Sequence, residues 1–287
     1  MSTALAGDIR DRLRAAADPS RAAGQQAYMK SSMPFLGVRV PEARRIATHA
    51  AKGTTDAAAL RETALQLWDA AGHREERYAA MALLARPLRG EPSLVPVIEH
   101  MVHTGQWWDY TDELAHRLAD LHDAHPEATV ALVHAWARAH DMWIRRIAIL
   151  SQLGRGIRAD RAVLVDTIEP NIADREFFIR KAIGWALREY ARIAPGWVRE
   201  YVAHRPLSPL SRREALKHLG ADVTVERPGP PRVGADSARS NPDTGHERSP
   251  RLDSEDGTRL VDRRCGIQDR HANARRLSGR GASRARS

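Results

Sequence analysis

Apolar residues recur at intervals of three and four from the start of the chain to about Gly220. This period places apolar side chains on one face of an α-helix, and no segment shows the alternation that marks a strand. Residues that begin or end helices, such as Asp141, Asp160 and Pro195, divide the pattern at regular intervals. We therefore predict an all-α fold built from roughly a dozen helices of ordinary length.

The predicted helices form pairs that recur at a spacing of roughly 35 to 40 residues, without a strong shared consensus. A degenerate array of this kind is typical of HEAT-like repeats, which stack into an α-α superhelix with one concave face. We expect this solenoid to occupy residues 1–220.

The composition changes after Gly220. Residues 221–287 contain no aromatic residue and consist largely of Arg, Ser, Gly, Pro and Asp. Such a stretch cannot bury enough apolar surface to fold, so we expect a disordered tail.

The formal net charge of the chain is +9, which favours an anionic partner but specifies neither a fold nor a chemistry. Residues 221–287 hold 14 arginines against 10 acidic residues, so the tail and the body are both only mildly basic. Binding of a polyanion by the body must therefore depend on where its cations cluster.

Cys265 is the only cysteine of the sequence, which excludes an intramolecular disulfide, a thiolate zinc finger and a four-cysteine iron–sulfur cluster. The sequence begins without the pattern of a secretory leader, and no apolar run approaches membrane-spanning length. The histidines form no closed set of metal ligands and no Walker pattern is present, so neither a metal nor a nucleotide cofactor is expected. We expect a cytoplasmic protein without membrane association.

Three segments place tryptophans beside a carboxylate or a cation, and the first of them is the helix expected to begin near Trp107. Its core stripe consists of Trp107, Leu114, Leu118 and Leu121. Trp108 and Asp112 lie together beside this stripe, and the next positions on their line, Ala115 and Ala119, are small enough to leave a hollow. A Trp and an Asp that border a hollow resemble a site. Alternatively, Trp108 packs against the next repeat and Asp112 caps or pairs locally.

The second segment contains Arg146. Apolar residues follow it at the helical spacings, namely Ile149, Leu150 and Leu153. Its stem therefore lies along an apolar strip, where a guanidinium needs an anion, and either Asp112 or a DNA phosphate could serve. The neighbouring Arg145 is expected on the solvated side. In the alternative interpretation, Arg146 forms a structural pair with a carboxylate between repeats.

The third segment is the helix that follows Glu176. Its buried face is defined by Ile179, Ile183, Leu187 and Tyr190. Trp185 lies roughly 140° from the centre of that face, so we expect it to be exposed. It shares a stripe with Phe178, Lys181 and Arg188, which matches an aromatic platform within a phosphate-binding surface. A second layer of helices that buries Trp185 is the alternative.

Several segments together carry a resemblance to a known family, and they span most of residues 1–220. They are Ala27-Tyr28-Met29-Lys30, Phe35-Leu36-Gly37-Val38 with Pro41, Trp107-Trp108-Asp109, and the block from Phe177 to Tyr190. With these motifs the chain resembles the DNA alkylation repair family of AlkD-like glycosylases. The last block is long and specific. Tyr110 stands where the family pattern leads us to expect a small residue.

The resemblance implies roles for individual residues. Asp112 is similar to the catalytic aspartate, Trp108 and Trp185 to the tryptophans that flank the deoxyribose of the lesion, Arg146 to the arginine on the DNA backbone, and Tyr28 and Lys30 to further residues that touch DNA. The implied reaction is hydrolysis of the N-glycosidic bond of a cationic N3- or N7-alkylated purine, such as 3-methyladenine or 7-methylguanine. It leaves an abasic site in duplex DNA. An open concave groove, a monofunctional enzyme and a monomer without cofactors are also expected.

The residues agree with this chemistry. Alkylation makes the base a cationic leaving group, so no general acid is needed, and the remaining requirement is to stabilise an oxocarbenium-like sugar and place a water. One carboxylate between two aromatic faces can do both. Two alternatives remain open, because repeat folds support many functions. A non-catalytic DNA-binding paralogue would not need Asp112, and a protein-interaction scaffold would not be expected to present Trp185 among cations.

Overall fold

The computed structural model describes residues 2–85 and 88–219, all of which belong to one unit, Met1–Val225. The predicted tail at 221–287 lies outside the described residues. Within the described ranges every regular element is helical, so the predicted all-α class is confirmed.

The described part of the chain contains thirteen α-helices and three short 3-10 helices. The α-helices are α1 (Ser2–Ala15), α2 (Pro19–Met29), α3 (Val40–Ala50), α4 (Ala57–Asp69), α5 (Arg74–Leu83), α6 (Val95–Gly105), α7 (Trp108–Ala124), α8 (Pro126–Trp136), α9 (Met142–Ile149), α10 (Arg161–Ile168), α11 (Phe177–Tyr190), α12 (Pro195–His204) and α13 (Pro209–Leu216). The 3-10 helices are η1 (Pro92–Leu94), η2 (Gly156–Arg158) and η3 (Glu169–Asn171).

The helices begin at the residues that the sequence pattern singled out. The Asp141 carboxylate caps α9 by accepting from the Trp143 and Ile144 amides, and Asp160 caps α10 in the same way. Pro195 occupies the first position of α12, where its missing N–H removes no intrahelical hydrogen bond. Local sequence therefore specifies these boundaries.

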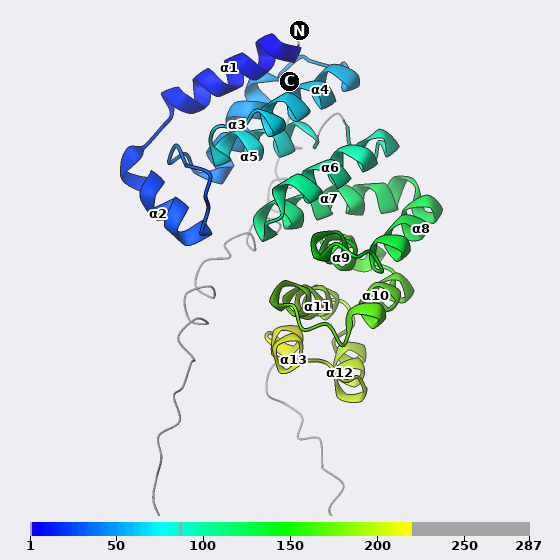
Figure 1. Cartoon of the computed structure of the whole chain (residues 1–287). Helices are drawn as coiled ribbons and strands as arrows, with labels where there is room; N and C mark the ends of the chain where they lie inside the picture. The colour runs from blue at the N-terminus through cyan, green and yellow to red at the C-terminus, as the bar shows by residue number, and fades with distance from the viewer. Residues whose placement is uncertain (1, 86–87, 220–287) are drawn as a thin grey trace, which may run out of the picture. The chain divides into compact units, whose positions relative to one another are not determined.

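The helices pack in two rows. The first row is the series α3, α5, α7, α9, α11 and α13, in which each helix contacts the next. The second row includes α4, α6, α8, α10 and α12, whose members pack against helices of the first row. Figure 1 shows the two rows separately where α9, α11 and α13 lie in one column and α8, α10 and α12 in the other. Packing between neighbours along the sequence is consistent with the predicted helical-repeat array.

The first row repeats with a regular period. Its members α5, α7, α9 and α11 begin at Arg74, Trp108, Met142 and Phe177, so successive starts are 34, 34 and 35 residues apart. Positions one period apart therefore occupy equivalent places on adjacent helices. This arrangement decides which charged side chains meet between repeats.

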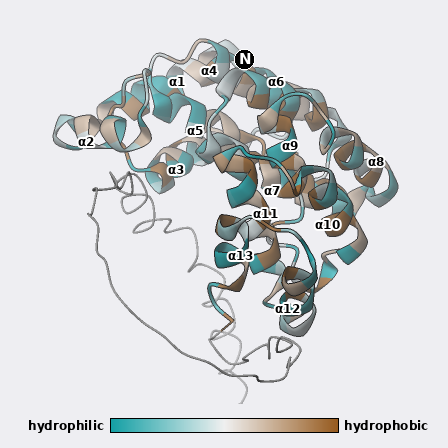
Figure 2. Ribbon diagram, turned by 60° about the horizontal axis from the view of Figure 1, so that its bottom comes forward, coloured by the Kyte–Doolittle hydropathy of each residue, from teal (hydrophilic) through white to brown (hydrophobic). Residues whose placement is uncertain are grey.

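A continuous apolar core runs between the rows. Hydrophobic and hydrophilic residues intersperse along the helices, as the brown and teal segments in Figure 2 show. The predicted stripe of α7 is buried at Leu114, Leu118 and Leu121. Burial is most complete in α5, where every residue except Arg77 is buried. None of the helices in the described ranges combines the length and the apolarity needed to span a bilayer.

The closest helix contact in the first row depends on a glycine. A Cβ at Gly184 of α11 would lie 2.5 Å from the Cβ of Glu214 and 2.8 Å from the carbonyl oxygen of Ser211, both on α13. The Ser211 oxygen belongs to the backbone, so a larger residue would force the two helices apart.

We predict that Gly184→Ala destabilises the protein by about 1–3 kcal/mol, because overpacking a close helix contact moves backbone. The measurement is the free energy of unfolding in urea. The matched control is Gly196→Ala in α12, where a Cβ meets no atom within 4 Å and the higher helix propensity of alanine should be neutral or stabilising. Equal effects of the two substitutions would contradict the close contact.

Candidate functional site

Asp112 and Arg146 form a bidentate ion pair between α7 and α9. Arg146 Nε donates to Asp112 Oδ1 and Nη2 donates to Oδ2, each at 2.9 Å. Both residues are almost fully enclosed, with exposed fractions of 5% for Asp112 and 2% for Arg146. Parallel hydrogen bonds of this kind fix the orientation of both side chains. The sequence left two possible anions for Arg146, Asp112 and a DNA phosphate. In the structure its partner is Asp112.

Arg146 also reaches the next helix of the row. Its Nη1 donates to the carbonyl oxygen of Phe178 at the start of α11, and its guanidinium carbon lies 5.7 Å from the centre of the Phe178 ring. One side chain thus joins α7, α9 and α11. In this arrangement the exposed fraction of Arg146 is only 2%, which leaves little surface for the DNA phosphate contact that the resemblance implies.

The hollow expected above Ala115 and Ala119 is absent. Both alanines are buried, and α7 packs against α8 and α9. Small residues at these positions allow neighbouring helices to approach closely, so the expectation of open space there was wrong.

The environment of Asp112 opposes its ionisation. Burial raises the pKa of the Asp112 carboxyl above its usual value of 3.8, and the charge of Arg146 acts in the opposite direction. A buried carboxylate with one bonded partner arginine keeps further oxygen lone pairs for another group. Positive charge that develops beside it would be stabilised strongly because little water screens the interaction.

A second carboxylate, that of the half-buried Asp109, holds the first turn of α7 against α5. Arg74 Nη2 donates to Asp109 Oδ1 at 2.6 Å, and the Tyr78 hydroxyl donates to Oδ2 at 2.7 Å. Burial raises the pKa of Asp109, against the charge of Arg74. Burial likewise raises the pKa of the Tyr78 hydroxyl, so it remains a donor. These bonds fix the start of the helix that carries Trp108 and Asp112.

The aromatic residues near the ion pair form a cluster across three helices. The Phe178 ring lies 4.9 Å from the Trp143 ring and 5.7 Å from the Trp107 ring, measured between centroids. Trp108 and Trp185 are half-buried and pack against the core. The expectation that Trp185 is exposed was therefore wrong in degree, because apolar neighbours cover part of its ring.

The predicted cationic stripe on α11 is largely paired within the protein. Lys181 Nζ and Arg188 Nη1 donate to the two oxygens of Glu214 on α13, at 2.8 and 2.7 Å. Glu214 is itself buried, so the shared pair connects the last two helices of the row. Tyr28 and Lys30, at the end of α2, are exposed to solvent.

Sequence reasoning did not identify Arg74 or Tyr78 as part of this region. A signal was present in the spacing, because Arg74 precedes Asp109 by 35 residues and Arg146 follows Asp112 by 34. These separations equal one repeat, so charges of opposite sign one period apart predict ion pairs between adjacent helices.

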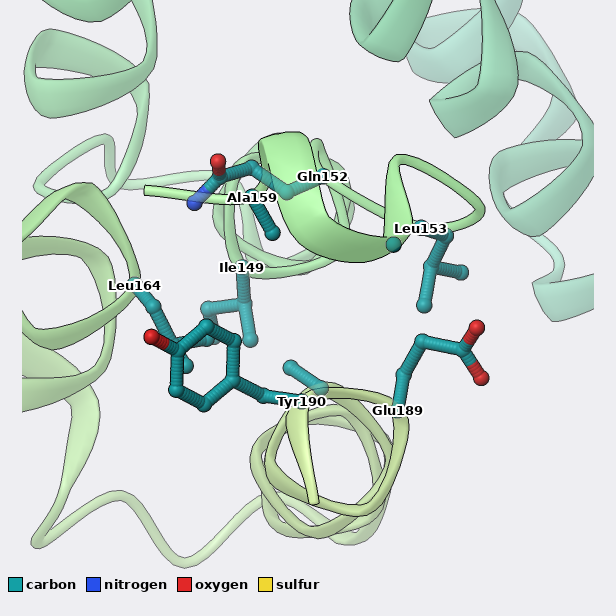
Figure 3. Close-up of a pocket in the computed structure, with 9 residues that line it drawn as sticks. Ile149, Gln152, Leu153, Ala159, Leu164, Glu189 and Tyr190 are labelled. Atoms are coloured by element: carbon teal, nitrogen blue, oxygen red, sulfur yellow. The ribbon is translucent and has the colours of Figure 1, made fainter. Parts of the chain in front are cut away.

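A small cavity elsewhere is too small to be the site. It measures about 20 Å³ and lies between α9, α10 and α11, lined by Ile149, Leu164 and Tyr190 among others (Figure 3). A space of that size holds a single water at most. No cluster of His, Cys, Asp and Glu side chains among the described residues could hold a metal ion.

Comparisons with known proteins find similarity to one family and to two solved structures. The family model described as DNA alkylation repair enzyme matches residues 9–219. A solved structure of a protein from Enterococcus faecalis, described as a predicted DNA alkylation repair enzyme, is 30% identical with a TM-score of 0.63, covering 71% of this chain and 97% of that one. The structure of smu.31 from Streptococcus mutans is 16% identical with a TM-score of 0.51, over 62% and 92% of the two chains, and shows similarity of fold alone. No curated protein gives a significant match.

We predict that Arg146→Ala lowers the free energy of unfolding by about 3–5 kcal/mol, because it leaves the Asp112 carboxylate buried without its partner. The measurement is chemical unfolding monitored by circular dichroism. The control is Arg12→Ala, which removes an exposed pair with Asp8 and should cost less than about 0.5 kcal/mol. A stable Arg146→Ala protein with a weaker salt dependence of DNA binding would instead indicate a phosphate contact.

Proposed function

The chain belongs to the DNA alkylation repair enzyme family, and on that premise we propose that it is a DNA glycosylase. The proposed reaction is hydrolysis of the N-glycosidic bond of cationic N3- or N7-alkylated purines in duplex DNA, of the 3-methyladenine and 7-methylguanine type. The product is an abasic site, and no metal or nucleotide cofactor takes part.

The observation that carries this proposal is the fixed carboxylate of Asp112. It is held at both oxygens by Arg146 and lies on the same helix as Trp108, one turn further on. An oxocarbenium-like sugar needs negative charge in a defined position and little screening of that charge by bulk water. A preoriented, buried carboxylate meets both requirements, and the protein around it needs to reorganise little during the reaction.

The step balances without a general acid. The bond between C1′ and the purine nitrogen breaks, its electron pair leaves with the base, and the positive charge of the alkylated base is neutralised. Asp112 stabilises the positive charge that remains on the sugar. Water then bonds to C1′ and releases its proton, to the carboxylate or to solvent.

Access to Asp112 requires movement when DNA binds, because only a small fraction of its surface is exposed. We propose that Trp108 and Trp185, both half-buried, rearrange to place their rings against the deoxyribose. Tyr28 and Lys30 are proposed to contact the DNA backbone. Lys181 and Arg188 with Glu214 leave one net positive charge, which can attract a phosphate without breaking either pair.

The deep burial of Asp112 also favours a second candidate function. In a non-catalytic DNA-binding paralogue, the same ion pair would serve only to join repeats, and DNA would bind without cleavage of any bond. A protein-interaction scaffold is the remaining alternative from the sequence, and no contact among the described residues favours it. The two candidates that bind DNA differ in one measurable property, the release of a free base.

We predict that Asp112→Asn abolishes release of 7-methylguanine from alkylated duplex DNA in single-turnover assays, while DNA binding is retained or slightly stronger. The substitution keeps the size of the side chain and removes the charge that faces the sugar. Retained binding also reports that the protein is folded. A rate within about threefold of the wild-type protein, a barrier change well under 1.4 kcal/mol, would exclude a catalytic role.

The matched control is Asp123→Asn on the same helix. Asp123 pairs with Arg155 and Arg158 near the other end of α7, so its loss should leave base release unchanged. If both substitutions reduce release equally, the effect arises from a general loss of inter-repeat pairing.

We further predict that, as the pH is lowered, the rate of base release begins to fall at a pH above 3.8, the usual carboxyl pKa. Burial raises the pKa of Asp112, and only its ionised form stabilises the sugar. The measurement is the single-turnover rate against pH at saturating DNA, corrected for spontaneous depurination. An acid limb centred at or below 3.8 would contradict the role of a buried carboxylate.

A further inference from the structure

An open pocket of about 360 Å³ lies beside the beginning of α7. One wall is the segment from Met29 to Met33 that follows α2, another is the first turn of α5, and the third is the junction of α6 and α7. The lining side chains that matter below are Lys30, Arg77, Gln106, Trp107 and Tyr110. None of them belongs to the Asp112–Arg146 pair.

Two cations of this pocket have no counter-charge. None of the ion pairs found in the described part of the chain includes Lys30 or Arg77. By contrast, Arg74, which also lines the pocket, is neutralised by Asp109. The pocket therefore carries uncompensated positive charge, although Arg74 is paired.

Aromatic rings hold the Arg77 guanidinium in place, but its N–H donors are poorly satisfied by hydrogen bonds. Its guanidinium carbon lies 4.6 Å from the Trp68 ring centre and 5.6 Å from that of Tyr110. Its Nε is buried without a hydrogen bond, and its Nη1 makes only a long bond of 3.4 Å to the Thr104 carbonyl. Aromatic rings that fix the plane of a guanidinium leave its edge available for an anion.

Two further buried polar groups in the same pocket find no acceptor for their protons among the described residues, although the Tyr110 oxygen lies near Arg77. They are the Tyr110 hydroxyl and Trp107 Nε1, and burial raises the pKa of Tyr110, so its hydroxyl keeps its proton. Unpartnered buried donors are uncommon because each one is destabilising. Three of them around one pocket indicate that a ligand with acceptor oxygens completes it.

The backbone of the pocket is strained and rigidly supported. Lys30 and Gln106, with φ of 49° and 40°, are the non-glycine residues of positive φ among those described. Strain of this kind persists where the surrounding structure enforces it and is common at binding sites. On the wall that follows α2, the Ser31 hydroxyl accepts from Arg74 Nη1 at 3.3 Å and donates to the Met33 carbonyl at 2.9 Å.

We propose that this pocket binds one phosphodiester of the DNA strand through Arg77 and Lys30. The proposal rests on the proposed function and extends it, because it assigns an anchor that holds the duplex beside Trp108 and Asp112. Trp107 lines the pocket and directly precedes Trp108, so a phosphate bound here lies next to the helix that carries the candidate catalytic carboxylate. Tyr110, which departs from the expected family pattern, places its ring beside the Arg77 guanidinium.

The first test measures binding of an undamaged duplex as a function of salt concentration for Arg77→Gln. Loss of one phosphate contact should lower the slope of log affinity against log salt by about one unit. The exposed Lys30→Gln substitution, which cannot disturb the core, should produce the same reduction. The matched control is Arg161→Gln, because Arg161 also stacks on a tryptophan, 5.7 Å from the Trp197 ring centre, outside the pocket; it should leave the slope unchanged.

The second test uses inorganic phosphate alone. The wild-type protein should gain thermal stability with added phosphate, and Arg77→Gln should gain less. Arg77→Gln could lose the stabilisation by phosphate while the slope of log DNA affinity against log salt stays unchanged. The pocket would then bind a free anion and not a DNA phosphodiester, which overturns the proposal. Unchanged slopes in both variants overturn the proposal entirely. Because the duplex is undamaged, these outcomes are independent of whether the protein releases a base.

Discussion

The pairing of buried charges between repeats is the constraint on which the rest of the structure depends. Apolar contact between amphipathic helices is non-directional, so it stacks the repeats without setting their register. Hydrogen-bonded ion pairs are directional, and they join α5 to α7 through Arg74 and Asp109, α7 to α9 through Asp112 and Arg146, and α11 to α13 through Glu214. An unpaired member of any of these would be strongly destabilising, so the row is stable in the one register that pairs them all.

The same pairing decides which charges remain for DNA. A formal net charge of +9 suggests a broadly attractive surface, but Arg74, Arg146, Lys181 and Arg188 each face a carboxylate of the protein. Cations without such a partner are the ones that can release counterions from a DNA backbone. Lys30 and Arg77 are in this group and lie in one pocket beside α7. Under the proposed function, the location of unpaired charge, rather than its total, therefore sets where a DNA phosphate can bind.

Under the proposed function, the candidate site gains its precision from repeat helices instead of from an enclosed cavity. Asp112 is oriented by a side chain of the next repeat, and the start of its helix is held by Asp109 against the preceding one. A carboxylate fixed from both sides needs little reorganisation as positive charge develops on a sugar. The arrangement also explains how one aspartate can stabilise the fold and serve chemistry, because the ion pair leaves carboxylate lone pairs unused.

The sequence by itself determined the all-α class and the helix boundaries, because helical period and capping residues act over a few neighbouring positions. The repeat that it predicted, roughly 35 to 40 residues, is slightly longer than the observed spacings of 34 and 35. The sequence also indicated Asp112 and the tryptophans, through motifs that resemble a family. It did not determine the partner of Arg146, the sharing of Glu214 by Lys181 and Arg188, or the partial burial of Trp185. The partners of these cations lie 26 to 34 residues away on other helices. Whether a charge is paired or free, and whether a ring is covered or open, depends on the stacking of whole repeats, and only the tertiary structure decided it.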